Sequence, residues 1–363
     1  MKKKVLVVGL GKMGQDDLKK LIELGMKPED IVGVDIDDAK VTAAVDAFPP
    51  GILFSFDRNV VAHAAIVATN TPSHAKVVID LMERGVKHIL VEKPLAFTLE
   101  EATLIGEIMK RTNAQVFTAF IVHWSEAIPA LVKRMENEEL VLTESHTAWG
   151  KNRMGDSRPT PGDLEDEMVH GAGMVHLLAG VNQVIDEIKV SGMLTFPNFA
   201  NREAQERAFA LDPSFPKEVN ASAYVHERIR TDVGLIPVAL RSSFIAPVQV
   251  RKVGGVLAYR HNPLVPVYSF EFSFDEKRDG ASVDVLTLTT LKGNTVSVTE
   301  HACDKLLEQM RGFLAAANEG IVDPRLTGYD DALKAVMFSE AVMASHNFDG
   351  AWHTALSRSK RST

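Results

Sequence analysis

The sequence predicts an α/β protein of two domains, a Rossmann-type doubly wound parallel sheet followed by an α+β domain with a large, mostly antiparallel open sheet. The chain has 363 residues, 45% of them hydrophobic, which is enough for more than one core. Up to about residue 120, short apolar runs alternate with amphipathic helical stretches, whereas apolar and polar residues alternate with period two beyond that point. We therefore expect domains at residues 1–122 and 123–363.

In the first domain, each apolar run is bounded by turn residues and followed by a helical pattern, which is typical of βαβ units in a parallel sheet. The runs are nearly continuous because helices cover both faces of such a sheet. The expected strands are 4–10, 30–36, 64–70, 88–94 and 114–120, and the expected helices are 14–25, 38–48, 74–85 and 99–112.

In the second domain, alternation with period two predicts strands that have one covered face. The expected strands are 140–150, 187–196, 248–261, 267–274, 281–293 and 294–302, and the expected helices are 164–180, 303–320 and 328–345. Helices on one face leave the other face open, and a second subunit is the usual cover.

Composition excludes several classes of protein. The formal net charge is −8 and no long lysine or arginine block occurs, so nucleic-acid binding is not expected. The single cysteine, Cys303, rules out an intramolecular disulfide, which fits a reducing compartment. No run of about 18 apolar residues predicts a membrane span, and the N-terminus lacks a signal-peptide cleavage site. We expect a soluble, cytoplasmic protein.

A Gly-x-Gly-x-x-Gly motif at 9–14 follows the first expected strand directly and opens a helix. Its first glycine permits a tight turn, its second lets the backbone approach a pyrophosphate, and its third lets helix and strand pack closely. The helix N-terminus adds free N–H groups and a partial positive charge. Dinucleotide binding is therefore predicted for Gly9, Gly11, Lys12, Met13 and Gly14. The alternative is an ordinary glycine-rich turn.

Asp35 ends the second expected strand, where a ribose-binding acid belongs. Its carboxylate can accept both ribose hydroxyls of NAD but would repel the 2′-phosphate of NADP. The next residue, Ile36, could not hold that phosphate either, so NAD is favoured over NADP. Asp35 could otherwise be only a turn residue.

The expected strands at 64–70 and 88–94 end in polar residues. Ligands of doubly wound sheets bind at the carboxyl ends of strands, so these segments are further candidates for cofactor binding: Thr69, Asn70, Thr71, Pro72, His74, Glu92 and Lys93. A lysine at position 93 can donate to the oxygen of a carbinol or carbonyl substrate. A surface pair with Glu92 is the alternative.

Residues 67–102, "VATNTPSHAKVVIDLMERGVKHILVEKPLAFTLEEA", resemble the signature of the glucose-fructose oxidoreductase/inositol dehydrogenase (Gfo/Idh/MocA) family. The resemblance implies an N-terminal dinucleotide domain and a C-terminal domain whose open sheet builds homodimers or homotetramers. It also implies that Lys93 is catalytic, with a peptide bond to Pro94 that is often cis, and that an Asp-x-x-x-His motif opens the second domain.

Asp166 and His170 supply that motif, and Gly180 follows at the spacing that the family implies. Residues i and i+4 share a helix face, so Asp166 could orient His170 as a general base. His176 lies about 120° off that face and is expected to be a buried polar residue. A metal site from Asp166, Glu167 and His170 lacks the His-Glu-x-x-His pattern, and no metal is expected.

The chain departs from the family after Phe120, where many members continue with Asn-Arg-Arg. His123 and Trp124 stand here as candidate substrate residues, and Trp124 could form a wall for a sugar ring or simply pack in a core. A loop at 149–163 adds the candidates Lys151, Asn152, Arg153 and Arg158. These cations could recognise an anionic substrate, or they could be solvated or paired with Asp156 and Asp163.

These residues together predict an NAD-dependent dehydrogenase or reductase of a secondary alcohol or ketone in a small molecule: a sugar, a sugar derivative or a cyclitol, with a phosphate, nucleotide or carboxylate group as one option. His170 would accept the hydroxyl proton, Lys93 would stabilise the developing alkoxide, and Asp166 would fix the imidazole. A non-catalytic NAD(P)-binding regulator is a second hypothesis, although it should lack one of these three residues. A reductase of an imine or tetrapyrrole is a third.

Overall fold

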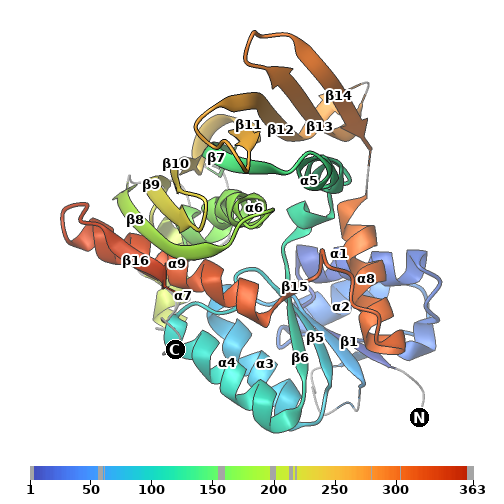
Figure 1. The fold of residues 1–363 in the computed structure, drawn as a ribbon. Coiled ribbons are helices and arrows are strands. Elements are labelled where there is room, and N and C mark those ends of the chain that lie inside the picture. Colours follow the sequence, from blue (N-terminus) through green and yellow to red (C-terminus); the bar gives the residue numbers. More distant parts are fainter. Residues whose placement is uncertain are drawn as a thin grey trace. The chain divides into compact units, whose positions relative to one another are not determined.

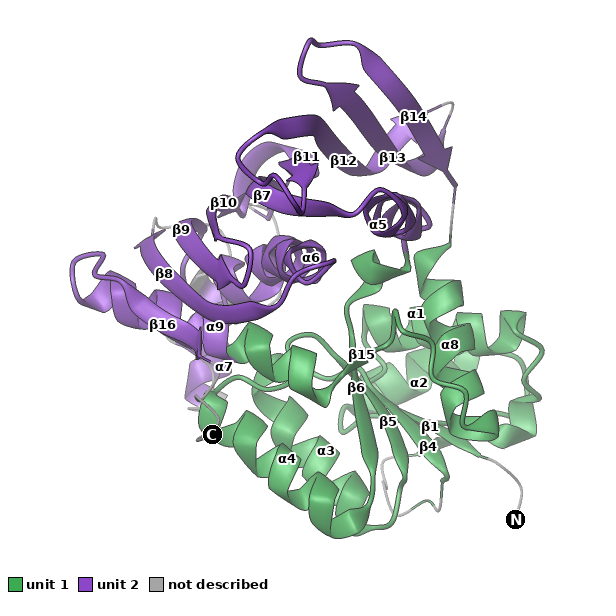
Figure 2. Ribbon diagram, viewed as in Figure 1, with its two compact units in different colours: residues 1–124, 304–336 green, residues 125–303, 337–363 purple. Residues whose placement is uncertain are grey.

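The computed structural model describes residues 4–55, 60, 62–153, 160–196, 202–211, 216, 219–278, 280–302 and 304–357. The chain forms two compact units (Figure 2). Unit 1 comprises Met1–Trp124 and Asp304–Val336, and unit 2 comprises Ser125–Cys303 and Met337–Thr363. The helix expected near 303–320 thus belongs to the first unit, to which the chain returns after the long sheet. The single boundary expected at residue 122 did not include this return.

Unit 1 is built on a seven-stranded sheet, sheet A, in the order β15-β6-β5-β4-β1-β2-β3. Its strands are β1 (Val5–Val8), β2 (Ile31–Val34), β3 (Leu53–Ser55), β4 (Ala64–Val67), β5 (His88–Glu92), β6 (Gln115–Ala119) and β15 (Thr327–Gly328). All neighbours are parallel except β15, which pairs antiparallel with β6. The strand order reverses between β1 and β4, which is the point where such sheets bind ligands.

Helices cover both faces of sheet A, as the continuous apolar strands predict (Figure 1). One face packs against α3 (His74–Glu83), α4 (Leu99–Thr112) and the start of α9 (Tyr329–Asn347). The other face packs against α1 (Lys12–Glu23), α2 (Asp38–Ala47) and α8 (Lys305–Glu319). Three 3-10 turns complete the unit: Pro28–Asp30, Thr71–Ser73 (η2) and Ile121–Trp124 (η3). The apolar face of α8, with Met310 and Phe313 in the core, explains why this segment returns to unit 1.

Unit 2 is built on a nine-stranded sheet, sheet B, in the order β14-β13-β12-β11-β7-β10-β9-β8-β16. Its strands are β7 (Leu140–Asn152), β8 (Ile185–Thr195), β9 (Ser222–Thr231), β10 (Leu235–Ser243), β11 (Ile245–Tyr259), β12 (Pro266–Arg278), β13 (Ala281–Thr290), β14 (Thr295–His301) and β16 (His353–Ser357). Among the strand pairs in the described residues, only β7–β10 is parallel. The predicted fold class, a parallel doubly wound sheet plus a large antiparallel one, is confirmed.

One face of sheet B carries α5 (Ala127–Asn137) and α6 (Val169–Ala179), as Figure 1 shows. A π-turn, Leu164–Met168 (η4), leads into α6, and the described helices of this unit also include α7 (Arg202–Leu211) and the end of α9. Gly171 lets α6 approach β7, since a Cβ there would lie 3.0 Å from Oγ1 of Thr147. On the other face, strand β9 alternates buried and exposed residues, and Tyr224 (56% exposed) and Met193 (64%) are open within this unit.

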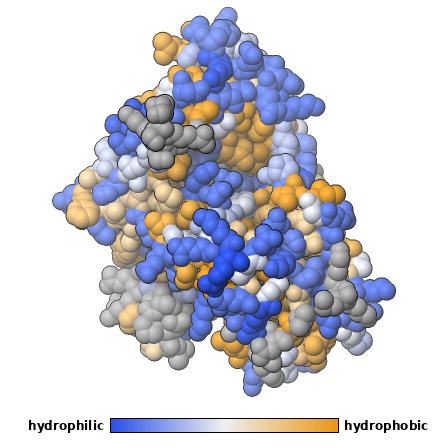
Figure 3. All heavy atoms as spheres, turned by 60° about the horizontal axis from the view of Figure 1, so that its bottom comes forward, coloured by the Kyte–Doolittle hydropathy of each residue, from blue (hydrophilic) through white to orange (hydrophobic). Residues whose placement is uncertain are grey.

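Polar and charged side chains cover much of the face seen in Figure 3, with hydrophobic side chains in smaller patches between them. This distribution agrees with the 24% of charged residues in the chain. No helix in the described part of the chain combines the length and hydropathy of a membrane-spanning segment.

Candidate active site

The glycine motif forms the turn between β1 and α1. Gly9 has φ +97°, and a Cβ there would lie 2.5 Å from the carbonyl oxygen of Ala68; a Cβ on Gly14 would lie 1.8 Å from the carbonyl oxygen of Gly9. A Cβ on Gly11 would meet nothing within 4 Å. Gly9 and Gly14 are therefore required by close packing within the protein, whereas Gly11 leaves an open approach to the backbone.

The N-terminus of α1 suits an anion. Gly11 is its N-cap and makes no side-chain cap, and the first turn, with Lys12 and Met13, holds no acidic residue. The backbone N–H groups and the helix dipole can therefore act on a phosphate group. The geometry of Gly11 and α1 fits the pyrophosphate of a dinucleotide.

Asp35, just after β2, is 6% exposed and held by the backbone. Its Oδ2 accepts a hydrogen bond from the Leu10 N–H (2.8 Å), and its Oδ1 accepts one from the Asp37 N–H (2.9 Å). The backbone N–H groups of Leu10 and Asp37 thus orient the carboxylate. The neighbouring Ile36 is 86% exposed. Lys40 Nζ lies 3.7 Å from Oδ2 of Asp35, a neighbour that the sequence analysis missed although its signal, a lysine in the first turn of the next helix, was available.

The loops after β4 and β5 lie at the same edge of sheet A as the glycine turn. The register pairs Val8 with Val67 and Val67 with Val91, so three neighbouring parallel strands end together. Thr69, Asn70, Thr71 and Pro72 follow β4, and Asn70 Oδ1 accepts from the Ser73 N–H at 3.1 Å. Glu92 is the last residue of β5, and the Lys93–Pro94 peptide bond is cis. The cofactor candidates of unit 1 are therefore gathered at one edge.

His74 belongs to the same group of candidates but is buried, with 1% of its surface exposed. Its ring lies between the carbonyl oxygens of Thr69 and Pro94. Burial is the main cause that lowers the pKa of His74 below its ordinary value.

His123 and Trp124 lie in η3, after β6. His123 Nδ1 is 3.0 Å from Oγ1 of Thr327, and burial lowers the pKa of His123 to about 4. Trp124 is 1% exposed, and its ring occupies the space that a Cβ on Gly312 would need, 2.2 Å away. The guanidinium of Arg325 lies 4.6 Å from the ring centroid. These contacts favour the packing role for Trp124.

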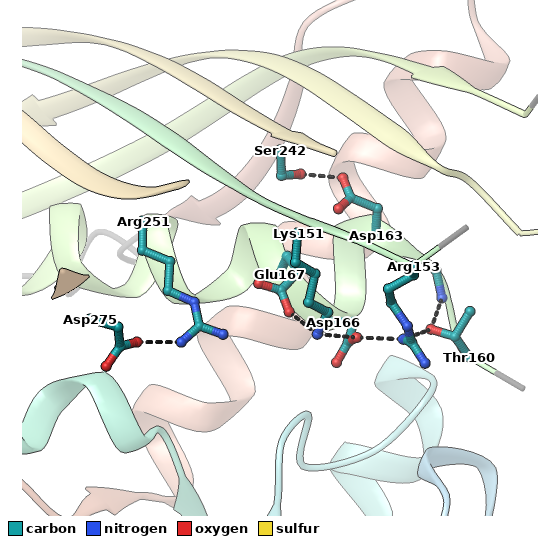
Figure 4. Close-up of polar contacts among 10 residues, drawn as sticks. Lys151, Arg153, Thr160, Asp163, Asp166, Glu167, Ser242, Arg251 and Asp275 are labelled. Atoms are coloured by element: carbon teal, nitrogen blue, oxygen red, sulfur yellow. Dashed lines mark hydrogen bonds and ion pairs between the residues drawn. The ribbon is translucent and has the colours of Figure 1, made fainter. Parts of the chain in front are cut away.

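In unit 2, Lys151 near the end of β7 and Arg153 just after that strand both hold the carboxylate of Asp166 (Figure 4). Asp166 Oδ2 accepts hydrogen bonds from Lys151 Nζ (3.2 Å) and Arg153 Nη1 (2.8 Å). Lys151 also pairs with Glu167, which is 1% exposed. Arg153, 7% exposed, donates to Oγ1 of Thr160 at 3.1 Å as well. The cations predicted to face an anionic substrate are thus engaged by protein carboxylates.

Two other candidates of this loop have different positions. Asn152 is the last residue of β7 and is exposed. Arg158 lies outside the described residues, as does Asp156, its suggested partner. Asp163 is described, but it accepts a hydrogen bond from Ser242.

Asp166 and His170 lie on different kinds of helical turn. Asp166 is in the π-turn η4, which winds more residues per turn than an α-helix, whereas His170 is in α6. A plain α-helical i,i+4 relationship was expected here. His170 is 6% exposed, and its ring stacks on Trp149 with 5.8 Å between centroids. Nε2 of His176, which is partly buried, lies 2.6 Å from Oε1 of the buried Glu227.

Two more acids near the start of this helix were not predicted as functional residues. Asp163 is fully buried, and burial raises its pKa to about 8. Burial likewise raises the pKa of Glu165 to about 7. Asn220 contacts the first two residues of η4: its Oδ1 accepts a hydrogen bond from the Leu164 N–H (2.8 Å), and its Nδ2 lies 3.4 Å from Oε2 of Glu165.

A comparison with known protein families decides what the glycine turn and the Lys93 loop belong to. Residues 3–120 match the model of an oxidoreductase family with an NAD-binding Rossmann fold, Gfo/Idh/MocA. Residues 3–120 are therefore similar to the NAD-binding domain of Gfo/Idh/MocA oxidoreductases. The resemblance seen at residues 67–102 is thereby confirmed, and the glycine turn is part of an NAD-binding fold.

A curated protein similar to this chain is the inositol 2-dehydrogenase of Burkholderia multivorans, which is 24% identical over 189 residues. The alignment covers 50% of this chain and 56% of that protein, so the chain spans about half the length of the relative that it matches.

Solved structures resemble this chain over almost its full length. Levoglucosan dehydrogenase in complex with NADH gives a TM-score of 0.72 at 18% identity, with 99% of this chain and 100% of that chain covered. The aldose-aldose oxidoreductase of Caulobacter crescentus, complexed with glycerol, gives 0.70 at 15% identity, with 97% and 99% covered. At these identities the likeness establishes the shared fold of both units.

Proposed function

We propose that this protein is an NAD-dependent oxidoreductase that acts on a secondary alcohol or ketone of a sugar, sugar derivative or cyclitol. The observation that carries the proposal is the placement of the glycine turn, Asp35 and Lys93 at one edge of sheet A. The relatives named above, an inositol dehydrogenase and a levoglucosan dehydrogenase, support polyol chemistry.

Gly11 and the N-terminus of α1 would hold the pyrophosphate of the cofactor, and Asp35 would accept hydrogen bonds from its ribose hydroxyls. The bound nicotinamide supplies the hydride acceptor or donor. We propose NAD rather than NADP because a 2′-phosphate would meet the carboxylates of Asp35 and Asp37. Lys40, 3.7 Å from Asp35, offsets only part of that negative charge.

In the oxidative direction, His170 would accept the hydroxyl proton of the substrate, and Lys93 would donate a hydrogen bond to the substrate oxygen as it becomes an alkoxide. Asp166 would stabilise the charged imidazole. Lys151 and Arg153 both hydrogen-bond to Oδ2 of Asp166 and so fix the position of this carboxylate. In reduction the roles reverse.

We propose a neutral rather than an anionic substrate. Lys151 and Arg153 were the best described candidates for binding a phosphate or carboxylate, but both are paired with Asp166, and Lys151 is paired with Glu167 as well. The two positive charges are thus matched by two negative ones. An anionic substrate would have to compete with these carboxylates.

A homodimer or homotetramer is also proposed, formed through the open face of sheet B. Exposed side chains on that face include Tyr224, Met193 and Leu235, which a second copy could bury.

The test of the proposed activity is NAD reduction by the full chain with a panel of inositols, neutral sugars, sugar phosphates and nucleotide sugars. We expect turnover with at least one neutral polyol. Tight NADH binding without turnover on any member would instead support the non-catalytic regulator.

A further inference from the structure

The imidazole of His74 lies between two loops, with one ring nitrogen facing a carbonyl oxygen of each, and the neutral ring donates its single N–H to one of the two. Nδ1 lies 2.8 Å from the carbonyl oxygen of Pro94, and Nε2 lies 3.1 Å from the carbonyl oxygen of Thr69. The side chain is 1% exposed, so water does not compete for these contacts.

The two carbonyl groups belong to the loops that follow neighbouring strands. Thr69 lies after β4 and before η2, and Pro94 directly follows Lys93 after β5. The parallel ladder between these strands ends at the pair Val67–Val91. Beyond that pair, the imidazole of His74 lies between the loop after β4 and the loop after β5 and can link them, as the ladder links the two strands.

We propose that His74 is a positioning residue that fixes the Lys93–Pro94 segment against the Thr69 loop and so sets the direction of the Lys93 side chain. The proposal rests on the role proposed above for Lys93. His74 itself need not touch cofactor or substrate, since both ring nitrogens face protein carbonyls. Removal of the ring leaves one buried carbonyl without its donor and empties the space between the two loops, which can then shift.

His63 offers a matched control in the same unit. Its Nδ1 lies 2.8 Å from the carbonyl oxygen of Lys4, and its Nε2 lies 3.0 Å from Oδ1 of Asn318. It therefore also bridges two oxygens, but it directly precedes β4 and lies at the amino edge of sheet A. Loss of His63 removes a comparable bridge far from the Lys93 loop.

The experiment compares His74→Phe, His74→Gln and His63→Phe in the full chain. The readouts are kcat and KM on the best alcohol substrate, the dissociation constant of NADH, and backbone amide exchange in 69–73 and 91–97. We expect His74→Phe to lower kcat by about 10²-fold, the effect of a small misplacement of a reacting group. Amide exchange should become faster in both segments.

His74→Gln should recover part of kcat because its amide can still donate to one carbonyl. His63→Phe should stay within about twofold of the wild type in kcat. Equal loss of kcat in the two phenylalanine variants, or unchanged amide exchange in both segments of His74→Phe, would overturn the proposal. If the wild type oxidises no alcohol, the proposed function fails, and amide exchange alone decides whether His74 fixes the loops.

Discussion

Lys151 Nζ lies 3.2 Å from Oδ2 of Asp166, the same oxygen that accepts from Arg153 at 2.8 Å. One carboxylate oxygen thus holds two cations at the start of the helix that carries His170. The arrangement changes what a mutation in this loop should do.

We expect Arg153→Ala to raise KM by the same factor for a neutral polyol and for its phosphate ester, because Arg153 is bound to Asp166 and Thr160. Turnover should fall for both substrates as Asp166 loses a partner. Steady-state kinetics on the two substrates measure this, with exposed Lys189→Ala, which pairs with Glu187, as the control. A KM increase confined to the phosphate ester would restore the anion-binding hypothesis.

Lys93→Ala and His170→Ala should each lower kcat by about 10²–10⁴-fold, the usual contribution of positioned acid–base groups. NADH affinity, measured by fluorescence titration, should change little. Lys87→Ala is the matched control for the lysine, since Lys87 directly precedes β5 at its other end and donates to the Thr112 carbonyl. Near wild-type turnover of His170→Ala would show that the base is another residue.

The wild type should prefer NAD to NADP in kcat/KM by at least about tenfold, or ~1.4 kcal/mol. The double variant Asp35→Ser, Ile36→Arg should reverse the preference. Lys40, whose Nζ lies 3.7 Å from Asp35 in the wild type, should add a positive charge for the 2′-phosphate. Initial rates with both cofactors test this. A wild type with the higher kcat/KM for NADP contradicts our interpretation of Asp35.

Stability should fall as pH rises through the range in which Asp163 ionises. Burial raises its folded pKa to about 8 from 3.8, so between these values the folded state keeps a proton that the unfolded chain has released. The stabilisation is complete at low pH and is lost as pH approaches about 8. Glu165, with a folded pKa of about 7, acts in the same direction.

Asp163→Asn keeps an oxygen that can accept from Ser242 but cannot ionise. Denaturant unfolding between about pH 5 and about pH 8.5 should therefore show a smaller fall in the free energy of unfolding for the variant than for the wild type. An identical pH dependence in both proteins would mean that Asp163 is ionised in the folded state.

Tyr224→Asp should reduce the molar mass in solution, because it places a charge on the open face of sheet B. Light scattering after size-exclusion chromatography measures the mass. Leu104→Asp, an exposed change on α4 in unit 1, should leave it unchanged. If the wild type is a monomer, or Tyr224→Asp keeps the full oligomer mass, sheet B does not form the interface.

The sequence by itself determined the features that depend on neighbours a few residues away. The glycine turn at 9–14, the apolar strands and the polar residues at their ends all follow from local patterns, and they predicted the cofactor edge of sheet A. Strand β9 shows the same alternation of buried and exposed residues, but it was not among the expected strands. Strands as short as β15, with two residues, leave no pattern to find.

Only the tertiary structure decided which partners distant residues have. The cations of the 149–163 loop left open whether they bind an anion, stay solvated or pair with nearby acids, and folding brings Arg153 to Asp166, thirteen positions away, and Lys151 to Glu167. His74 had the sequence context of a cofactor residue, and the packing of two loops placed it between carbonyl groups instead. The return of α8 to unit 1 likewise depends on which core accepts its apolar face. A charge or an apolar face can be satisfied by any complementary group within reach, and the sequence does not specify that group until the chain is packed.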